Sequence, residues 1–145
     1  MKTFFNLINP FMKLLLRSPL HSLISRNTMI IKYVGHKSGK VLSTPISYVK
    51  KENTILSFAD PIHLWWKNIQ VNEDVELTIE RKIYKGKAKI IEDQNEIIEN
   101  YNYFLKILPR SAKFSNVQLD DKNHPVLNDV IAASKKVKFA KIVLN

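Results

Sequence analysis

The sequence of 145 residues contains no cysteine. This absence excludes a disulfide framework, a thiolate zinc site, a cysteine nucleophile and a redox dithiol, and it fits a reducing cytoplasm. Only three glycines occur, which excludes a collagen-like chain, a glycine-rich linker and the GxGxxG dinucleotide fingerprint. No uninterrupted apolar run approaches the ~18–20 residues that a membrane-spanning helix requires.

Acidic residues are also few, with 13 Asp and Glu against 23 Lys and Arg, a net charge of +10. This excess indicates an anionic partner: nucleic acid, an anionic membrane surface or a phosphorylated small molecule. Arginine is scarce, four against nineteen lysines, whereas specific base and phosphate readers favour the arginine fork. We therefore expect no nucleic-acid partner. A nucleic-acid-binding barrel remains the weakest of three hypotheses, and it predicts strongly salt-dependent binding.

Residues 1–25 have apolar side chains at helical spacing, with polar and basic residues on the opposite side. This pattern predicts an amphipathic N-terminal helix. Such a helix either packs on the rest of the molecule or lies on a membrane surface through its apolar face. We therefore expect a cytoplasmic protein with a possible peripheral membrane contact.

Residues 28–91 are rich in β-branched and aromatic side chains, interrupted by short turns. They predict antiparallel strands over 28–34, 40–50, 54–58, 75–80 and 83–91, with a short helix over 61–72. Pro45 lies inside the second run, so that strand should be bulged or lie at a sheet edge. A helix over 93–108, a loop over 111–123, a short helix over 125–133 and a closing strand over 137–144 follow. No linker interrupts 1–145, so we expect a single domain, mainly β with helices (α+β), built as a small barrel.

The turn Gly35-His36-Lys37-Ser38-Gly39-Lys40 is the most informative stretch. Its glycines allow close backbone approach to a ligand, its lysines supply positive charge, and its serine supplies a hydroxyl, a combination that suits a phosphate. It is not a Walker A sequence, because the GxxxxGK[ST] spacing is missing. A solvated hairpin tip is the alternative interpretation.

The pair Trp65-Trp66 is the second feature. Adjacent residues cannot share one face of a helix, so we expect one ring in the core and the other in a groove or against a partner. An aromatic wall suits a flat ring system. Burial of both rings in the core or an interface is the alternative.

No catalytic constellation is visible, and the catalytic residues stay unknown. The four histidines have no ligand partner at metal-binding spacing, so we expect no metal site. No GxSxG nucleophile and no paired carboxylates occur. Either the protein only binds a ligand, or an organic cofactor carries the chemistry and the protein orients it.

Three segments, NPFMKLLLRSPLHSL, GHKSGK with the following STPISYV, and WWKNIQVNEDVEL, together resemble the deazaflavin-dependent nitroreductase family. The resemblance runs from about residue 9 to residue 91. It implies a split β-barrel related to the FMN-binding pyridoxamine 5′-phosphate oxidases. By position it implies cofactor-binding roles for eight residues. The phosphate contacts would be His36, Lys37, Ser38 and Lys40, and the other cofactor-site residues would be Thr44, Pro45, Trp65 and Asn68.

The reaction that the resemblance implies is hydride transfer from reduced deazaflavin (coenzyme F-420), or from FMN, to a quinone or nitro compound. It also implies a homodimer. Two segments depart from the family pattern: Ser57-Phe58-Ala59-Asp60 replaces a lysine and paired glycines, and Ile131-Ala132-Ala133-Ser134 replaces a tyrosine-rich stretch. These departures keep a second hypothesis open, a non-catalytic split barrel that holds a flavin, haem or another flat ligand.

Overall fold

The computed structural model describes residues 27–59 and 64–145. The helix expected over 1–25, its membrane contact and the first residues of the helix expected over 61–72 lie outside the described residues.

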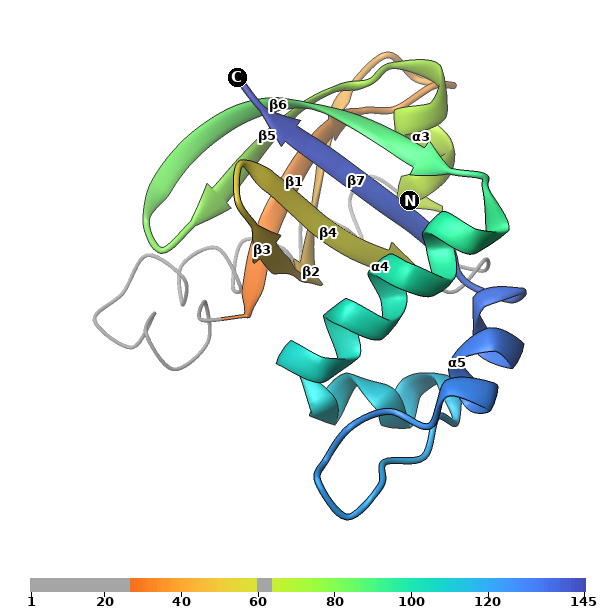
Figure 1. Ribbon diagram of the computed structural model, residues 1–145. Coiled ribbons are helices and arrows are strands. Elements are labelled where there is room, and N and C mark those ends of the chain that lie inside the picture. Colours follow the sequence, from red (N-terminus) through yellow and green to blue (C-terminus); the bar gives the residue numbers. More distant parts are fainter. Residues whose placement is uncertain (1–26, 60–63) are drawn as a thin grey trace.

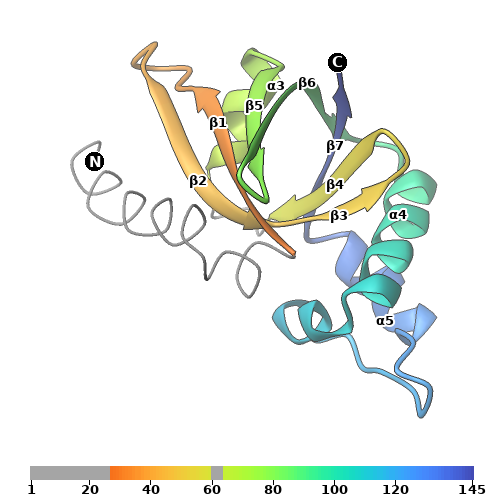
Figure 2. The ribbon, with the colours of Figure 1, turned by 90° about the vertical axis from the view of Figure 1, so that its left-hand side faces the viewer.

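Seven strands form one antiparallel sheet that curves into a half-barrel (Figures 1 and 2). They are β1 (Thr28–Val34), β2 (Val41–Ser47), β3 (Val49–Lys51), β4 (Thr54–Ala59), β5 (Asp74–Ile79), β6 (Lys82–Ile91) and β7 (Lys138–Leu144). Their order across the sheet is β2-β1-β5-β6-β7-β4-β3. The last strand in sequence therefore lies between β6 and β4 and joins the two halves of the sheet.

The run expected as one strand over 40–50 is two strands, and that prediction is corrected. β2 pairs with β1, whereas β3 pairs with β4. The break falls at Tyr48, whose backbone N–H donates to the Asn27 carbonyl at 2.9 Å as the chain changes partner. β2 is an edge strand with Pro45 opposite Ile30, and an edge tolerates the missing proline N–H.

The described residues also form three α-helices and one 3-10 helix. They are α3 (Trp65–Val71), α4 (Gln94–Ile107), the 3-10 helix η1 (Pro109–Ser115) and α5 (Leu127–Ser134). α4 begins where the Asp93 carboxylate accepts the Glu96 N–H at 2.9 Å, a side-chain N-cap. The loop expected over 111–123 is partly wrong, because η1 begins at Pro109, which suits the first helical position, and continues to Ser115.

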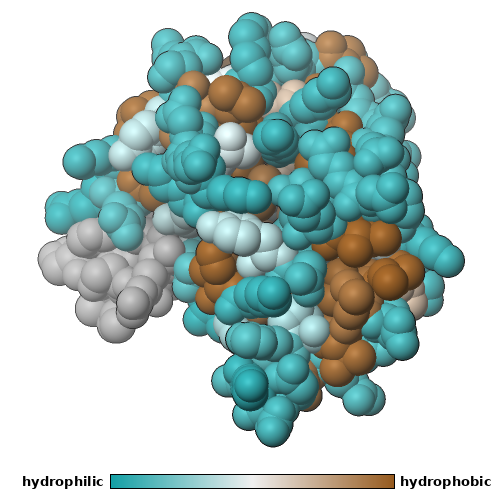
Figure 3. Space-filling view, viewed as in Figure 1, coloured by the Kyte–Doolittle hydropathy of each residue, from teal (hydrophilic) through white to brown (hydrophobic). Residues whose placement is uncertain are grey.

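Two apolar clusters lie on opposite faces of the sheet. The inner cluster fills the half-barrel and includes Met29, Ile31 and Leu77. The outer cluster packs α4 against β4 and β7, with Phe104 and Phe139 at its centre. Hydrophilic side chains cover most of the surface seen in Figure 3, and hydrophobic surface gathers beside α4 and α5.

Tyr48 makes the stability of the fold depend on pH in the alkaline range. Burial, then the nearby Glu80 charge and Tyr84, raise the pKa of Tyr48 to about 12. The unfolded chain ionises its tyrosines near pH 10, so between pH 10 and 12 the unfolded state loses a proton that the folded state keeps. We expect the unfolding free energy to be unaffected by Tyr48 below pH 10 and to fall on the order of 2 kcal/mol by pH 12. Urea unfolding at pH 9 to 12 measures this, and Tyr48→Phe should flatten the slope; an unchanged slope contradicts the assignment.

Candidate functional site

The β1–β2 turn is held by its own backbone. The Gly35 N–H donates to the Lys40 carbonyl and the Gly39 N–H to the Gly35 carbonyl, each at 2.8 Å. Gly39 has a φ of 69°, which a side chain would strain. The Ser38 hydroxyl accepts the Lys40 N–H at 3.2 Å. The Lys37 and Lys40 side chains are exposed, so the turn presents two ammonium groups on a fixed backbone.

The side chain of Asn68, on α3, holds this turn in place through hydrogen bonds. Its Oδ1 accepts the backbone N–H of His36 at 2.9 Å and contacts the ring Nδ1 of the same histidine at 2.6 Å. Its Nδ2 donates to the Leu64 carbonyl at 3.1 Å. Because Oδ1 only accepts, Nδ1 of His36 carries the proton, and Nε2 is left for another contact. The structure thus brings two predicted site residues, His36 and Asn68, into direct contact.

One face of α3 joins this turn to a cavity. Trp65 and Asn68 are three residues apart and therefore share a helix face. Trp65 lines the cavity, whereas Asn68 binds His36. Both tryptophans are buried, with exposed fractions of 5% for Trp65 and 8% for Trp66. Trp65 is thus the ring at the groove, as expected for one of the pair, whereas Trp66 is not among the described lining residues. Both rings nevertheless belong to the inner cluster, as the alternative interpretation expected.

The other two predicted residues lie on β2 between the turn and the cavity. The Thr44 Oγ1 and the Tyr33 hydroxyl share a hydrogen bond of 3.1 Å. Burial raises the pKa of Tyr33, partly opposed by this bond, so the phenol stays neutral at physiological pH. Pro45 is half-buried and precedes Ile46, which lines the cavity.

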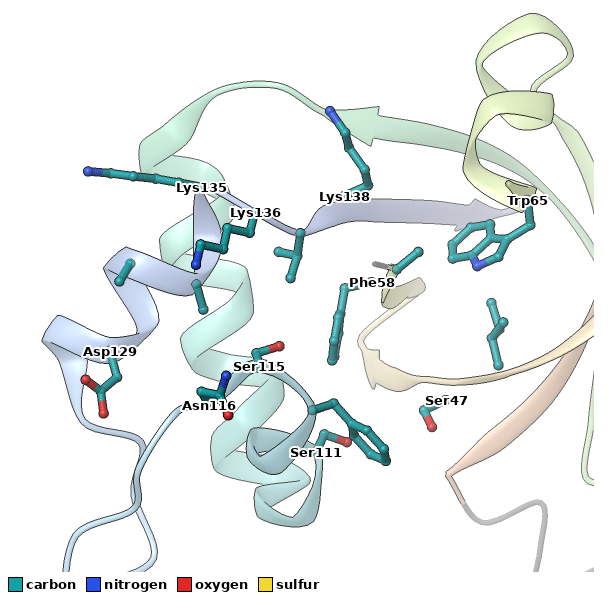
Figure 4. Close-up of a pocket in the computed structure, with 16 residues that line it drawn as sticks. Ser47, Phe58, Trp65, Ser111, Ser115, Asn116, Asp129, Lys135, Lys136 and Lys138 are labelled. Carbon is teal, nitrogen blue, oxygen red and sulfur yellow. The ribbon is translucent and has the colours of Figure 1, made fainter. Parts of the chain in front are cut away.

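The cavity has a volume of about 1000 Å³ and lies where β2, β4 and β7 meet η1 and α5 (Figure 4). Its aromatic walls are Phe58, Trp65 and Phe114. Its polar lining includes the Ser47, Ser111, Ser115 and Asn116 side chains, one carboxylate, Asp129, and three lysines, Lys135, Lys136 and Lys138. Such a volume is at the upper end of the range for small-molecule sites. Of the eight predicted site residues, Trp65 alone is among the described lining residues; the others are His36, Lys37, Ser38, Lys40, Thr44, Pro45 and Asn68.

Ser115 links the cavity to a buried phenol. The Tyr101 hydroxyl, fully buried, donates to Ser115 Oγ. Burial raises the pKa of Tyr101, and the bond to Ser115 partly opposes it. The Ser115 hydroxyl proton therefore remains available for donation. The sequence did not predict the part of the cavity that η1 and α5 line, because residues 111–123 were expected to be a loop. The three lysines at 135, 136 and 138 were the only sequence pattern that could have indicated it.

The segments that depart from the family pattern also contribute to the cavity. Phe58 and Ala59 line it, whereas the Ser57 hydroxyl points elsewhere and donates to the Ser47 carbonyl at 2.7 Å. On α5, Ala132 and Ala133 line the cavity. None of the described lining residues is a tyrosine or a histidine. Within residues 27–59 and 64–145, no cluster of three metal-ligating side chains occurs.

A family model described as F420H2-dependent quinone reductase matches residues 20–126 of this chain. The match includes the β1–β2 turn and α3. No curated protein sequence matches the chain significantly.

Several solved structures share the fold at low sequence identity. A FAD-binding protein from Mesorhizobium loti is 11% identical with a TM-score of 0.60, over 88% of this chain and 90% of that chain. An F420-H2 dependent reductase, FDR-A, is 19% identical with a TM-score of 0.56, over 81% of this chain and 94% of that one. A haem storage protein from Vibrio cholerae is 10% identical with a TM-score of 0.51, over 95% and 90%. These likenesses show the fold, a split barrel of the pyridoxamine 5′-phosphate oxidase type.

Proposed function

The chain belongs to the F420H2-dependent quinone reductase family, and from that premise we propose that it binds reduced coenzyme F-420 and delivers a hydride to a quinone-type or nitro-type acceptor. The supporting observation is the single face of α3 that carries both Trp65 at the cavity and Asn68 on the basic turn. A shift of this helix would move both parts together. In this proposal the two parts act as one site with a polar end and an aromatic end.

The donors of the turn fit the phosphate-bearing part of such a cofactor. Lys37 and Lys40 supply two exposed ammonium groups, and the Ser38 hydroxyl keeps its proton for donation after accepting the Lys40 N–H. Nε2 of His36 is oriented by the contact that Asn68 makes with Nδ1, and it would donate to a phosphate from the imidazolium form, in which both ring nitrogens carry protons. FMN also carries a phosphate, so these donors alone do not separate the two cofactors. In this proposal His36, Lys37, Ser38 and Lys40 bind the anionic part.

The aromatic end would take the ring system and the acceptor. When bound, reduced deazaflavin supplies a hydride. β2 joins the turn to the cavity over seven residues, roughly 20 Å, a span that suits an extended cofactor. Thr44 and Pro45 lie along this path, and Trp65 and Phe58 would exclude water from the reacting rings. The hydroxyls of Ser47, Ser111 and Ser115 are neutral proton donors among the described lining residues.

Anaerobic mixing of the protein with reduced F-420 and a naphthoquinone tests this proposal. We expect the cofactor to be oxidised, with its visible absorbance returning in proportion to hydroquinone formed, at a rate that scales with protein concentration. Reduced FMN with the same quinone, corrected for its reaction without protein, is the comparison. Binding of a cofactor with no turnover of quinone or nitro acceptors would instead favour a non-catalytic holder of a flavin, haem or another flat ligand.

We also propose that the protein is a cytoplasmic homodimer. A structural neighbour with a TM-score of 0.57 and 15% identity is described as a domain-swapped dimer. Among the described residues, no helix has the length and apolar character needed to span a bilayer. Sedimentation analysis of the full chain tests the dimer, and a monomer at micromolar concentration contradicts it.

A further inference from the structure

The cavity carries more positive than negative charge. Three lysines line it, in the connection from α5 to β7 and at the start of β7, against the single carboxylate of Asp129 among the described lining residues, a balance of 3 − 1 = +2. The Asp129 Oδ2 already accepts the Gln118 N–H at 3.0 Å. No described carboxylate lies within 4.0 Å of the ammonium groups of Lys135, Lys136 or Lys138.

The end of α5 explains only part of this cluster. Lys135 is the C-cap of α5, where a cation stabilises the negative end of the helix dipole. Lys138 lies on β7, with its ammonium 5.0 Å from the centre of the Trp66 ring. Figure 4 shows the Lys136 side chain on the same side of the cavity as Ser115 and Asn116, whereas Lys135 and Lys138 extend outward. Lys136 is therefore the lysine best placed to meet a ligand in the cavity.

The cavity is also lined by aromatic rings from three elements, β4, α3 and η1. Phe58 is half-buried and Trp65 is buried, whereas the Phe114 ring is 83% exposed at the cavity. Stacking against such rings favours a planar aromatic ligand, while an ammonium with no acidic partner favours an anionic substituent on it. Lys136 is exposed and has no acidic partner within 4.0 Å among the described residues, so its ammonium is available to such a substituent, whereas a neutral quinone offers it none.

We propose that the acceptor site selects an aromatic quinone bearing an anionic group, a carboxylate or a sulfonate, and that Lys136 recognises this group, supported by the field of Lys135 and Lys138. This inference rests on the proposed function, because it assigns the cavity to the acceptor. Lys136 is a specificity-determining residue in this account and takes no part in hydride transfer.

Calorimetric titration of the F-420-bound protein with two naphthoquinones tests the inference independently of turnover. The probes are menadione, which is neutral, and naphthoquinone sulfonate, which is anionic. We expect the sulfonate to bind about tenfold more tightly than menadione, as one charge-assisted contact allows. The double variant Lys135→Gln/Lys136→Gln should remove this preference and leave menadione binding unchanged. Lys138 is retained in the variant because of its contact with Trp66.

The matched control is Lys82→Gln/Lys85→Gln, which removes two exposed lysines of β6 and should leave the preference intact. Equal affinities for the two quinones in the unaltered protein overturn the inference. So does an affinity loss in the Lys135/Lys136 variant that falls on F-420 instead of the sulfonate, because those lysines would then serve the cofactor. Failure of the proposed function gives a different result, an absence of quinone reduction whatever the binding preference.

Discussion

Replacing Lys37 and Lys40 together with glutamine should weaken the binding of F-420 at least a hundredfold. Each charge-assisted contact to a phosphate contributes about 1.5–3 kcal/mol, and about 1.4 kcal/mol corresponds to a factor of ten. Both side chains are exposed, and the turn is held by backbone bonds and by Asn68. The variant should therefore keep the thermal stability of the parent. Fluorescence titration with F-420 measures the change in affinity.

The β6 variant Lys82→Gln/Lys85→Gln separates local contact from overall charge. It removes the same two charges from a net charge of +10 but leaves the turn unaltered. We expect its F-420 affinity to change less than threefold at physiological salt, because exposed charges beyond a Debye length of about 8 Å are screened. Equal losses in the two variants would mean that F-420 responds to the general field and not to the turn.

Asn68→Ala should lower the unfolding free energy by about 2–4 kcal/mol and loosen the β1–β2 turn. The side chain is 7% exposed and makes three contacts, two with His36 and one with the Leu64 carbonyl. Its removal leaves the His36 N–H without its partner, and each lost hydrogen bond of this kind costs about 1–3 kcal/mol. Urea unfolding measures the stability, and hydrogen exchange at the His36 amide measures the turn, where we expect much faster exchange.

Asn100→Ala is the matched control for this substitution. Asn100 is 9% exposed on α4, and its Nδ2 donates to the Glu96 carbonyl at 2.8 Å. Its loss should destabilise the outer cluster without altering exchange at His36 or the affinity for F-420. If Asn68→Ala lowers stability but leaves both of these readouts unchanged, then Asn68 is only a buried structural residue and does not position the site.

Local pattern predicted the strands well, for physical reasons. The run over 28–34 is β-branched and ends at a glycine turn, and β1 occupies those residues. The position of Pro45 predicted an edge strand correctly because proline lacks the N–H that a central strand needs. The split of the second run at Tyr48 was not predictable in the same way. β3 exists because the chain meets β4 there, which is a tertiary pairing.

In the candidate site, too, the parts formed by neighbouring residues were predictable and the parts formed by tertiary contacts were not. Glycines and lysines adjacent in sequence made the basic turn visible, whereas the Asn68 contact joins residues 32 positions apart. The cavity gathers β2, β4, η1, α5 and β7, and no short segment contains its pattern. The sequence predicted that α3 is a helix with Trp65 and Trp66 on different faces. It could not predict that both rings are buried, because their burial depends on the curvature of the sheet around them.

Titration of the full chain with F-420, followed by the fluorescence of the cofactor and with FMN as a parallel ligand, shows whether the chain binds the cofactor of its family. We expect saturable binding of F-420, one per chain, that is lost when Lys37 and Lys40 are replaced. The absence of saturable F-420 binding, or binding of FMN alone, would contradict the claim that this split barrel is an F-420-dependent reductase.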